Sequence, residues 1–128
     1  MSHVSDDGSL VTVSPPRELT DEAVASVLRD LEARLARGGT YGLIFDLSNA
    51  GTPNAVQRQL LAAHMRKNRA LIARNVRRLA VVAPSSLVRG VLTAIFWIEP
   101  PPVPYEVFSS RNEAITWALS SGAPKARP

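Results

Sequence analysis

Side chains able to do chemistry gather in two short stretches of the sequence, "DLSNAGTPN" at 46–54 and "APSSLVR" at 83–89. Their carboxylate, hydroxyl, amide and guanidinium groups are of the kinds that bind an anion or the polar surface of a partner. The candidate rim residues are Asp46, Ser48, Asn49, Thr52, Asn54, Ser85, Ser86 and Arg89. The same side chains also suit a structural part, in which the hydroxyls cap helices and Asp46 accepts from backbone amides.

Catalysis finds little support around these hydroxyls. A serine nucleophile needs a base within hydrogen-bond reach, yet His64 falls roughly three turns into the helix that follows Ser48. His3 stands alone near the N-terminus, so the two histidines form no metal pair. The chain has no cysteine and no glycine-rich phosphate loop. We therefore expect a protein that is not an enzyme and that has no catalytic residue, metal or cofactor.

Each polar stretch begins at the end of an apolar run that is typical of a strand buried on both faces. These runs are "YGLIFDLS" at 41–48 and "RRLAVVAPS" at 77–85. Each leads into a helix, the first capped by Thr52 and running to about Asn75, the second over 86–98. In an open parallel sheet the loops after the strands share one edge, where ligands bind. We therefore expect the candidate residues to meet at this edge.

The remaining elements complete an α/β domain. The turn signal Asp6-Asp7-Gly8 predicts an N-terminal hairpin, and Thr20 is a good cap for the first helix. "VPYEVF" at 103–108 predicts the last strand, which a capped helix follows. The predicted order is β-β-α-β-α-β-α-β-α, with a mixed, mostly parallel sheet. We expect a single domain over 1–121 and a flexible tail over 122–128.

Charge is distributed unevenly along the chain, whose formal net charge is +4. Residues 1–46 carry eight acidic and four basic side chains, whereas residues 47–98 carry eight basic and no acidic ones. Three arginines share one side of the helix after Thr52 and form the basic ridge: Arg58, Arg66 and Arg69. The ridge predicts contact with an acidic or phosphorylated protein or an anionic lipid, or else a solvated face that pairs with acids of the first helix. Nucleic acid is disfavoured, because no aromatic residue interleaves the arginines.

The stretch "FWIEPPPVPYEVF" at 96–108 contains the end of the helix over 86–98. Because that helix has almost no polar face, we expect it to be largely covered, within the protomer, in a homodimer or around a ligand pocket. Pro100 ends the helix, and Trp97 and Tyr105 predict an apolar patch beside it. The apolar run is too short to span a bilayer, the N-terminus lacks the pattern of a secretory signal, and the absence of cysteine suits the cytoplasm.

The order of elements resembles that of the STAS domain, the fold of bacterial anti-sigma-factor antagonists and of sulfate-transporter cytosolic domains. "YGLIFDLSNAGTPNAVQRQLLAAHM" and "RRLAVVAPSSLVRGVLTAI" carry the resemblance. It implies a bacterial signalling or protein-interaction module. Where that family has a phosphorylatable serine in an Asp-Ser-Ser-Gly-like setting, this chain reads Gly51-Thr52-Pro53-Asn54, which leaves Thr52 and the upstream Ser48 as candidate phosphosites. A further resemblance to lipid-transfer CRAL-TRIO domains implies the alternative of a small ligand or lipid in an apolar pocket lined by the helix over 86–98.

Overall fold

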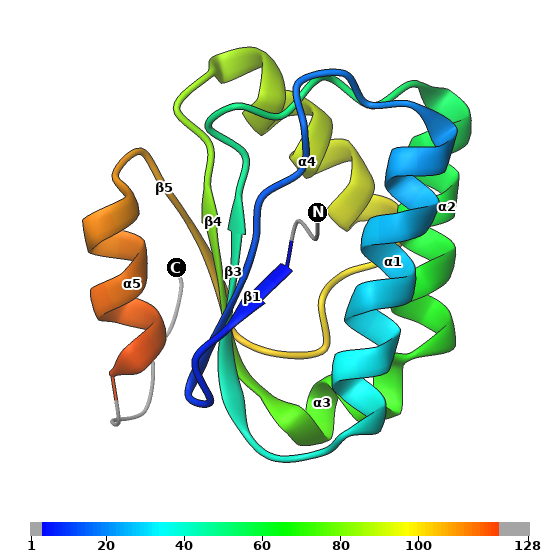
Figure 1. The fold of residues 1–128 in the computed structure, drawn as a ribbon. Coiled ribbons are helices and arrows are strands. Elements are labelled where there is room, and N and C mark those ends of the chain that lie inside the picture. The colour runs from blue at the N-terminus through cyan, green and yellow to red at the C-terminus, as the bar shows by residue number, and fades with distance from the viewer. Residues whose placement is uncertain (1–3, 121–128) are drawn as a thin grey trace.

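One five-stranded sheet organises the described part of the chain, which in this computed structural model is residues 4–120 (Figure 1). The strands are β1 (Val4–Asp6), β2 (Leu10–Val13), β3 (Tyr41–Asp46), β4 (Val76–Val82) and β5 (Tyr105–Phe108). They lie side by side in chain order, with β1 antiparallel to β2 and the other neighbours parallel. β1 and β5 therefore form the two edges of the sheet.

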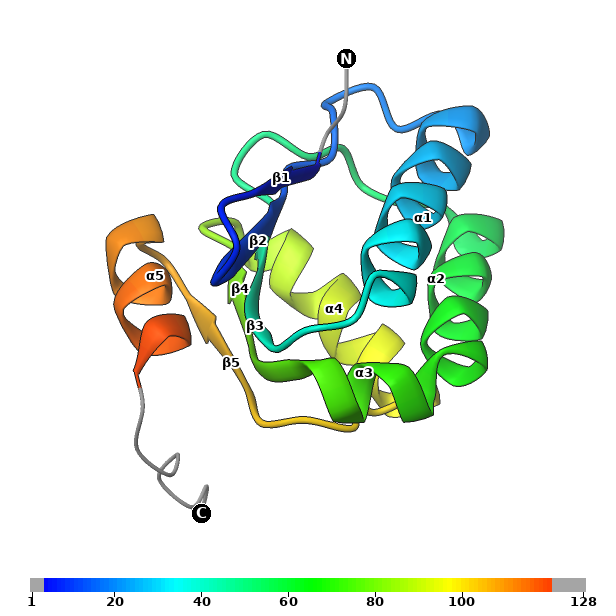
Figure 2. The same ribbon diagram turned by 60° about the horizontal axis from the view of Figure 1, so that its bottom comes forward.

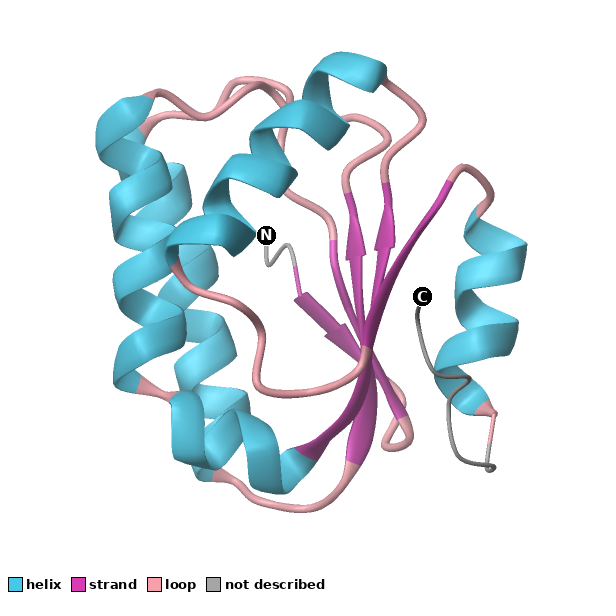
Figure 3. Cartoon of the chain, turned by 180° about the vertical axis from the view of Figure 1, so that it is seen from behind, coloured by secondary structure: helices cyan, strands magenta, loops and turns pink. Residues whose placement is uncertain are grey.

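Helices cover both faces of this sheet. They are α1 (Asp21–Ala36), α2 (Ala55–Lys67), α3 (Arg69–Asn75), α4 (Ser86–Ile98) and α5 (Arg111–Leu119). The helices α1 to α4 lie on one face and α5 on the other (Figure 2), and the same layers are seen from behind in Figure 3. Crossovers of one hand between successive parallel strands leave their helices on one side, which accounts for the first group. The predicted mixed, mostly parallel α/β fold is confirmed, while His3 and the tail lie outside the described residues.

Apolar side chains form a separate core on each face of the sheet. The larger core lies between the sheet and α1, α2 and α4, and its buried members include Val11, Val13, Leu31, Tyr41, Val81 and Phe96. The smaller core lies under α5 and consists of Leu10, Ile44, Ala80, Val82, Ala114 and Ala118. Successive residues of a strand point to opposite faces, so Leu43 belongs to the larger core and Ile44 to the smaller.

α5 approaches the sheet closely and is tied to it by a buried arginine. A Cβ atom on Gly42 of β3 would lie 2.7 Å from the backbone oxygen of Ala118, so this approach requires glycine. Arg78 of β4 donates from Nη1 to the backbone oxygen of Trp117 over 2.9 Å. Its guanidinium carbon also lies 5.0 Å from the centre of the Trp117 ring, a cation–π distance.

A second buried arginine joins the N-terminal hairpin to α1. Arg34 places its Nε 2.6 Å from Oδ2 of Asp6, an ion pair without the alignment of a hydrogen bond. Its Nη1 donates to the backbone oxygen of Gly38 over 2.7 Å. The guanidinium carbon lies 4.2 Å from the centre of the buried Tyr41 ring. These contacts hold the edge strand β1 against the end of α1.

The helix after β3 begins two residues later than predicted. Its N-cap is Asn54 and not Thr52. Asn54 Oδ1 accepts from the backbone nitrogen of Gln57 over 2.8 Å, and Gln57 Oε1 accepts from the backbone nitrogen of Asn54 over 3.0 Å. Thr52 has no such reciprocal partner, so the capping box decides the start of the helix.

The same helix, predicted to be continuous to about Asn75, is divided at Asn68. The Asn68 Nδ2 atom donates to the backbone oxygen of His64 over 3.0 Å. The backbone nitrogen of Asn68 donates to the same oxygen, also over 3.0 Å. It also lies 3.2 Å from Oε1 of Glu32 on α1. An asparagine side chain that bonds the preceding turn competes with the regular ladder, and here a contact with another helix holds it in place. The prediction of one long helix was therefore wrong.

Candidate functional site

The loops after β3, β4 and β5 lie at the same end of the sheet (Figure 3), as expected for the carboxyl ends of parallel strands. Oδ1 of Asp46 accepts from Ser48 Oγ over 2.6 Å and from the Ser48 backbone nitrogen over 3.1 Å. Oδ2 of Asp46 accepts from Nη1 of Arg111 over 2.9 Å. Arg111 begins α5 and was not among the residues expected at this rim. The sequence signal that could have identified it is a basic first-turn residue in a helix that starts at the same edge.

The other rim residues comprise two helix caps, one arginine that bonds neighbouring loops and three free side chains. Asn54 caps α2 and Ser85 caps α4, accepting from the backbone nitrogen of Val88 over 3.5 Å. Arg89 donates from Nε to the backbone oxygen of Ala83 over 2.7 Å and from a second nitrogen to Ser109 Oγ. Three side chains are exposed and make no hydrogen bond within residues 4–120: Asn49, Thr52 and Ser86.

Two arginines of the basic ridge meet an acid that follows α4. Nε of Arg66 lies 3.2 Å from Oε1 of Glu99, and Nη1 of Arg69 lies 2.9 Å from Oε2 of the same carboxylate. The side chain of Glu99 is 13% exposed, whereas those of Arg66 and Arg69 are 62% and 49% exposed. One carboxylate shared by two guanidinium groups leaves an excess of positive charge beside the end of α4.

The third ridge arginine lies apart from this pair. Arg58 donates from Nη1 to the backbone oxygen of Pro53 over 3.1 Å, at the opposite end of α2. The acids of α1 do take part in pairing, but with another residue, because Oε1 of Glu32 lies 3.4 Å from Nζ of Lys67. Arg58 and the pair of Arg66 and Arg69 therefore have different partners, and the ridge as one binding surface stays a prediction.

Helix α4 is covered on one side only. Leu92, Ile95 and Phe96 are buried against the sheet, whereas Leu87 is 64% and Trp97 is 85% exposed. We name the apolar part of the exposed side the outer α4 face and define it by five residues: Leu87, Gly90, Ala94, Trp97 and Ile98. Arg89 and Thr93 of the same helix are also exposed and adjoin this face. The expectation that this helix is largely covered therefore fails within the single chain.

The two residues of the predicted apolar patch, Trp97 and Tyr105, line one shallow groove between α4 and β5. Its volume is about 290 Å³, and its lining combines apolar side chains such as Phe96 and Val107 with the polar side chains of Arg89 and Thr93. Tyr105 packs edge-on against Phe96, with ring centres 5.0 Å apart and planes at 64°. Tyr105 is half-buried by this contact, so the most exposed member of the patch is Trp97.

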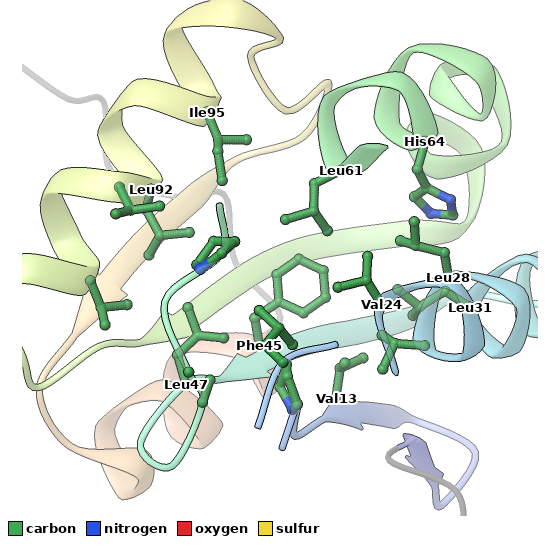
Figure 4. Close-up of a pocket in the computed structure, with 18 of the residues that line it drawn as sticks. Val13, Val24, Leu28, Leu31, Phe45, Leu47, Leu61, His64, Leu92 and Ile95 are labelled. Atoms are coloured by element: carbon green, nitrogen blue, oxygen red, sulfur yellow. The ribbon is translucent and has the colours of Figure 1, made fainter. Parts of the chain in front are cut away.

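On its covered side, α4 borders an apolar cavity of about 110 Å³ (Figure 4). Phe45 of β3 forms its floor, α1 contributes Val24 and Leu31, and α4 contributes Leu92 and Ile95. Phe45 belongs to a central strand but is only partly buried. A close-packed core would cover such a ring, so its residual exposure is a direct sign of the cavity.

His64 of α2 is the one ionisable residue among the described residues that line this cavity. Its side chain is 9% exposed, and its Nδ1 lies 3.6 Å from Oε1 of Glu32 and 3.3 Å from Nδ2 of Asn68. Burial lowers the pKa of His64 below its ordinary value of 6.5, although the Glu32 carboxylate opposes this effect and Lys67 adds to it. The imidazole is therefore neutral at pH 7.

This lowered pKa predicts a pH dependence of stability. In the unfolded chain His64 is protonated near its ordinary pKa of 6.5, whereas in the folded chain its pKa is lower, so protonation requires a more acidic solution. The contribution of neutral His64 is therefore present above pH 6.5 and declines as the pH falls below it. We expect urea unfolding between about pH 7.5 and pH 5.5 to show this decline in the wild type and to lack it in His64→Leu. Parallel pH profiles for the two proteins would contradict the assignment.

The mixed five-stranded sheet, with four helices on one face and one on the other, defines the chain as a STAS-like α/β domain. A family model described as SpoIIAA-like matches residues 10–119, and the chain belongs to this family. The resemblance identified in the sequence is confirmed, and membership indicates a STAS-like domain of the signalling or protein-interaction kind. No curated protein and no solved structure matches the chain. Within residues 4–120, no helix is long and apolar enough to cross a bilayer, and no three His, Cys, Asp or Glu residues form a group that could hold a metal ion.

Proposed function

We propose that the chain is a non-enzymatic protein-interaction module of bacterial cytoplasmic signalling, and that its partner binds the outer α4 face. The observation that carries the proposal is Trp97, which is 85% exposed among the apolar residues of the outer α4 face. Contiguous apolar surface of this kind marks interaction sites, and tryptophan is enriched among the residues that dominate binding energy. Each square ångström of apolar surface that the partner covers contributes roughly 25 cal/mol.

The charges beside this face indicate the chemistry of the partner. Arg66 and Arg69 share the single carboxylate of Glu99 next to the end of α4. An apolar segment flanked by acidic side chains would complement both the apolar outer α4 face and the excess positive charge. Phosphorylation stays a prediction in this proposal. Thr52 is the freer candidate, since the Ser48 hydroxyl donates to Asp46.

Trp97→Glu is expected to weaken capture of the partner by roughly tenfold or more, because a buried carboxylate replaces a central apolar contact. The matched control is Leu119→Glu, which changes an exposed residue of α5 on the opposite face of the sheet. Both variants should melt close to the wild type, since exposed substitutions alter stability little. The measurement is affinity capture with each variant, followed by titration of the purified partner at several salt concentrations.

Other occupants of the outer α4 face would give different results in the same experiment. A homodimer would appear as a wild-type mass twice that of the chain, dissociated by Trp97→Glu. An anionic lipid surface would appear as binding to phosphatidylserine vesicles that salt reverses. Either result, or equal capture by Trp97→Glu and Leu119→Glu, would overturn the proposed acidic protein partner.

The second candidate function is the binding of a small apolar ligand. The cavity between the sheet and α1, α2 and α4 favours it, since five residues of α4 line this space: Val88, Val91, Leu92, Ile95 and Phe96. This observation is independent of the outer α4 face, because it concerns the opposite side of the helix.

A further inference from the structure

We infer that the cavity binds a small, neutral, unbranched alkyl molecule that carries one hydroxyl group, and that this hydroxyl hydrogen-bonds to Nε2 of His64. The inference rests on the second candidate function and specifies its ligand. It is carried by three properties of the cavity, which are its shape, the charge of its walls and the position of its single imidazole.

The shape of the cavity favours a narrow chain over a bulky ring system. A volume of about 110 Å³ approaches that of an engineered apolar cavity of about 150 Å³ that admits benzene. A second, smaller space of about 40 Å³ lies next to it and shares four lining residues with it: Leu31, Phe45, His64 and Met65. The two spaces extend along α1 from Val24 to Leu35, roughly 16 Å at 1.5 Å per residue.

The walls of the cavity exclude a charged ligand. Among the described residues, no aspartate, glutamate, lysine or arginine lines either space. Moving an ionised group from water into such surroundings without a partner costs several kcal/mol or more, so a neutral molecule is favoured. A water molecule is poorly stabilised in this cavity, because it needs two to four hydrogen-bond partners. The larger space offers only one polar side chain, that of His64.

His64 supplies the one directional contact. Its Nδ1 faces Glu32 and Asn68 on the side of α1, whereas its Nε2 has no hydrogen-bond partner within residues 4–120. Figure 4 shows the imidazole beside Leu28 and Leu31 at the margin of the apolar lining. A hydroxyl both donates and accepts, so it pairs with Nε2 in either tautomer, while a carboxylate only accepts and brings a charge.

Titration of the full chain with octanol and with octanoate tests this ligand class by following backbone amide shifts in NMR spectra. We expect saturable octanol binding, with the largest shifts around Phe45 and His64. Octanoate should bind at least roughly tenfold more weakly, because its charge cannot be paired in the cavity. His64→Leu should weaken octanol by roughly tenfold, the worth of one hydrogen bond to a buried group, while xenon still enters the cavity.

Two variants of α4 separate the cavity from the outer α4 face. Val91→Phe adds a ring to the cavity lining and should lower octanol affinity by at least roughly tenfold. Leu87→Phe adds the same ring on the outer face, where Leu87 is 64% exposed, and should leave octanol binding unchanged. If Val91→Phe fails to fold, Leu61→Phe fills the same cavity from α2.

Several results would overturn the inference. They are non-saturable octanol binding, equal binding of octanol and octanoate, or equal effects of the folded Val91→Phe and Leu87→Phe variants. Unchanged octanol affinity in His64→Leu would show that the ligand hydroxyl does not hydrogen-bond to His64. Loss of octanol binding alone does not affect partner capture at Trp97, so failure of this inference and failure of the protein-interaction proposal are distinguishable.

Discussion

Replacing Arg34 with leucine is expected to lower the free energy of unfolding by about 3 kcal/mol, a change of more than a hundredfold in the folding equilibrium. The substitution removes the ion pair with Asp6, the hydrogen bond to the Gly38 carbonyl and the contact with the Tyr41 ring. Breaking one member of a buried pair is costly because its partner stays desolvated. Removing one partner of a buried ion pair costs about 3–5 kcal/mol. We expect a loss at the lower end of this range, because the Asp6 side chain is 19% exposed and Nη1 of Arg37 lies 3.6 Å from its Oδ2 atom.

Urea unfolding of the wild type, Arg34→Leu and Arg29→Leu measures this effect. Arg29 is an exposed residue of the same helix, so its substitution should change stability by less than about 0.5 kcal/mol. Equal unfolding midpoints for the two variants would show that the Arg34 contacts contribute nothing.

The pH dependence of the same measurement tests the Asp6 pairing directly. The hydrogen bond from the Gly8 backbone nitrogen lowers the pKa of Asp6 below 3.8, and the charges of Arg34 and Arg37 lower it further, although burial opposes them. A carboxyl with a lowered folded pKa stabilises the fold above its unfolded pKa, and this contribution is lost as the pH falls through the folded value. We expect a smaller acid-induced loss of stability in Arg34→Leu than in the wild type.

Gly42→Ala is expected to destabilise the fold by about 2 kcal/mol and to loosen α5 from the sheet. The added Cβ would lie 2.7 Å from the Ala118 carbonyl oxygen, and the obstructing atom belongs to a helix backbone that cannot rotate aside. Relief requires α5 to move away from the smaller core, which weakens the apolar contacts under the helix.

Trp117 reports this movement if Trp97 is first replaced by phenylalanine, which leaves one tryptophan in the chain. In that background, Gly42→Ala should shift Trp117 emission to longer wavelength as the ring gains water. The matched control is Gly90→Ala on the outer α4 face, where a Cβ meets nothing within 4 Å. That substitution should stabilise the fold by roughly 0.5–1 kcal/mol through helix propensity. Equal effects at the two glycines would show that the close approach of α5 is not required.

Local patterns were sufficient to predict most elements of the fold. The apolar runs at β3 and β4 are continuous because both faces of the sheet are covered, and that property is visible in the composition of a strand. Thr20, Ser85 and Ser110 accept from backbone donors three residues ahead, as helix caps do. The break at Asn68 escaped prediction, because it involves Glu32, which is 36 residues away in the sequence.

The candidate site was predictable only in part. Parallel connections imply that the loops after β3 and β4 share an edge, so the placement of these two loops followed from the order of elements. The interaction partners of the candidate residues could not be predicted from the order of elements. Asp46 pairs with Arg111, which is 65 residues away in the sequence, and two of the ridge arginines, Arg66 and Arg69, pair with Glu99 and not with the acids of α1. Such pairings depend on which helix ends meet in space.

The sequence by itself determined the α/β class, the family resemblance and the apolar character of the helix over 86–98, because residue period, capping and turn chemistry act within a few neighbouring positions. Only the tertiary structure decided how that helix is used. One side lines a cavity with His64 in its wall, and the other side leaves Trp97 exposed. The physical reason is that burial, cavities and ion pairs arise from contacts between segments far apart in the chain, and no local pattern records those distances.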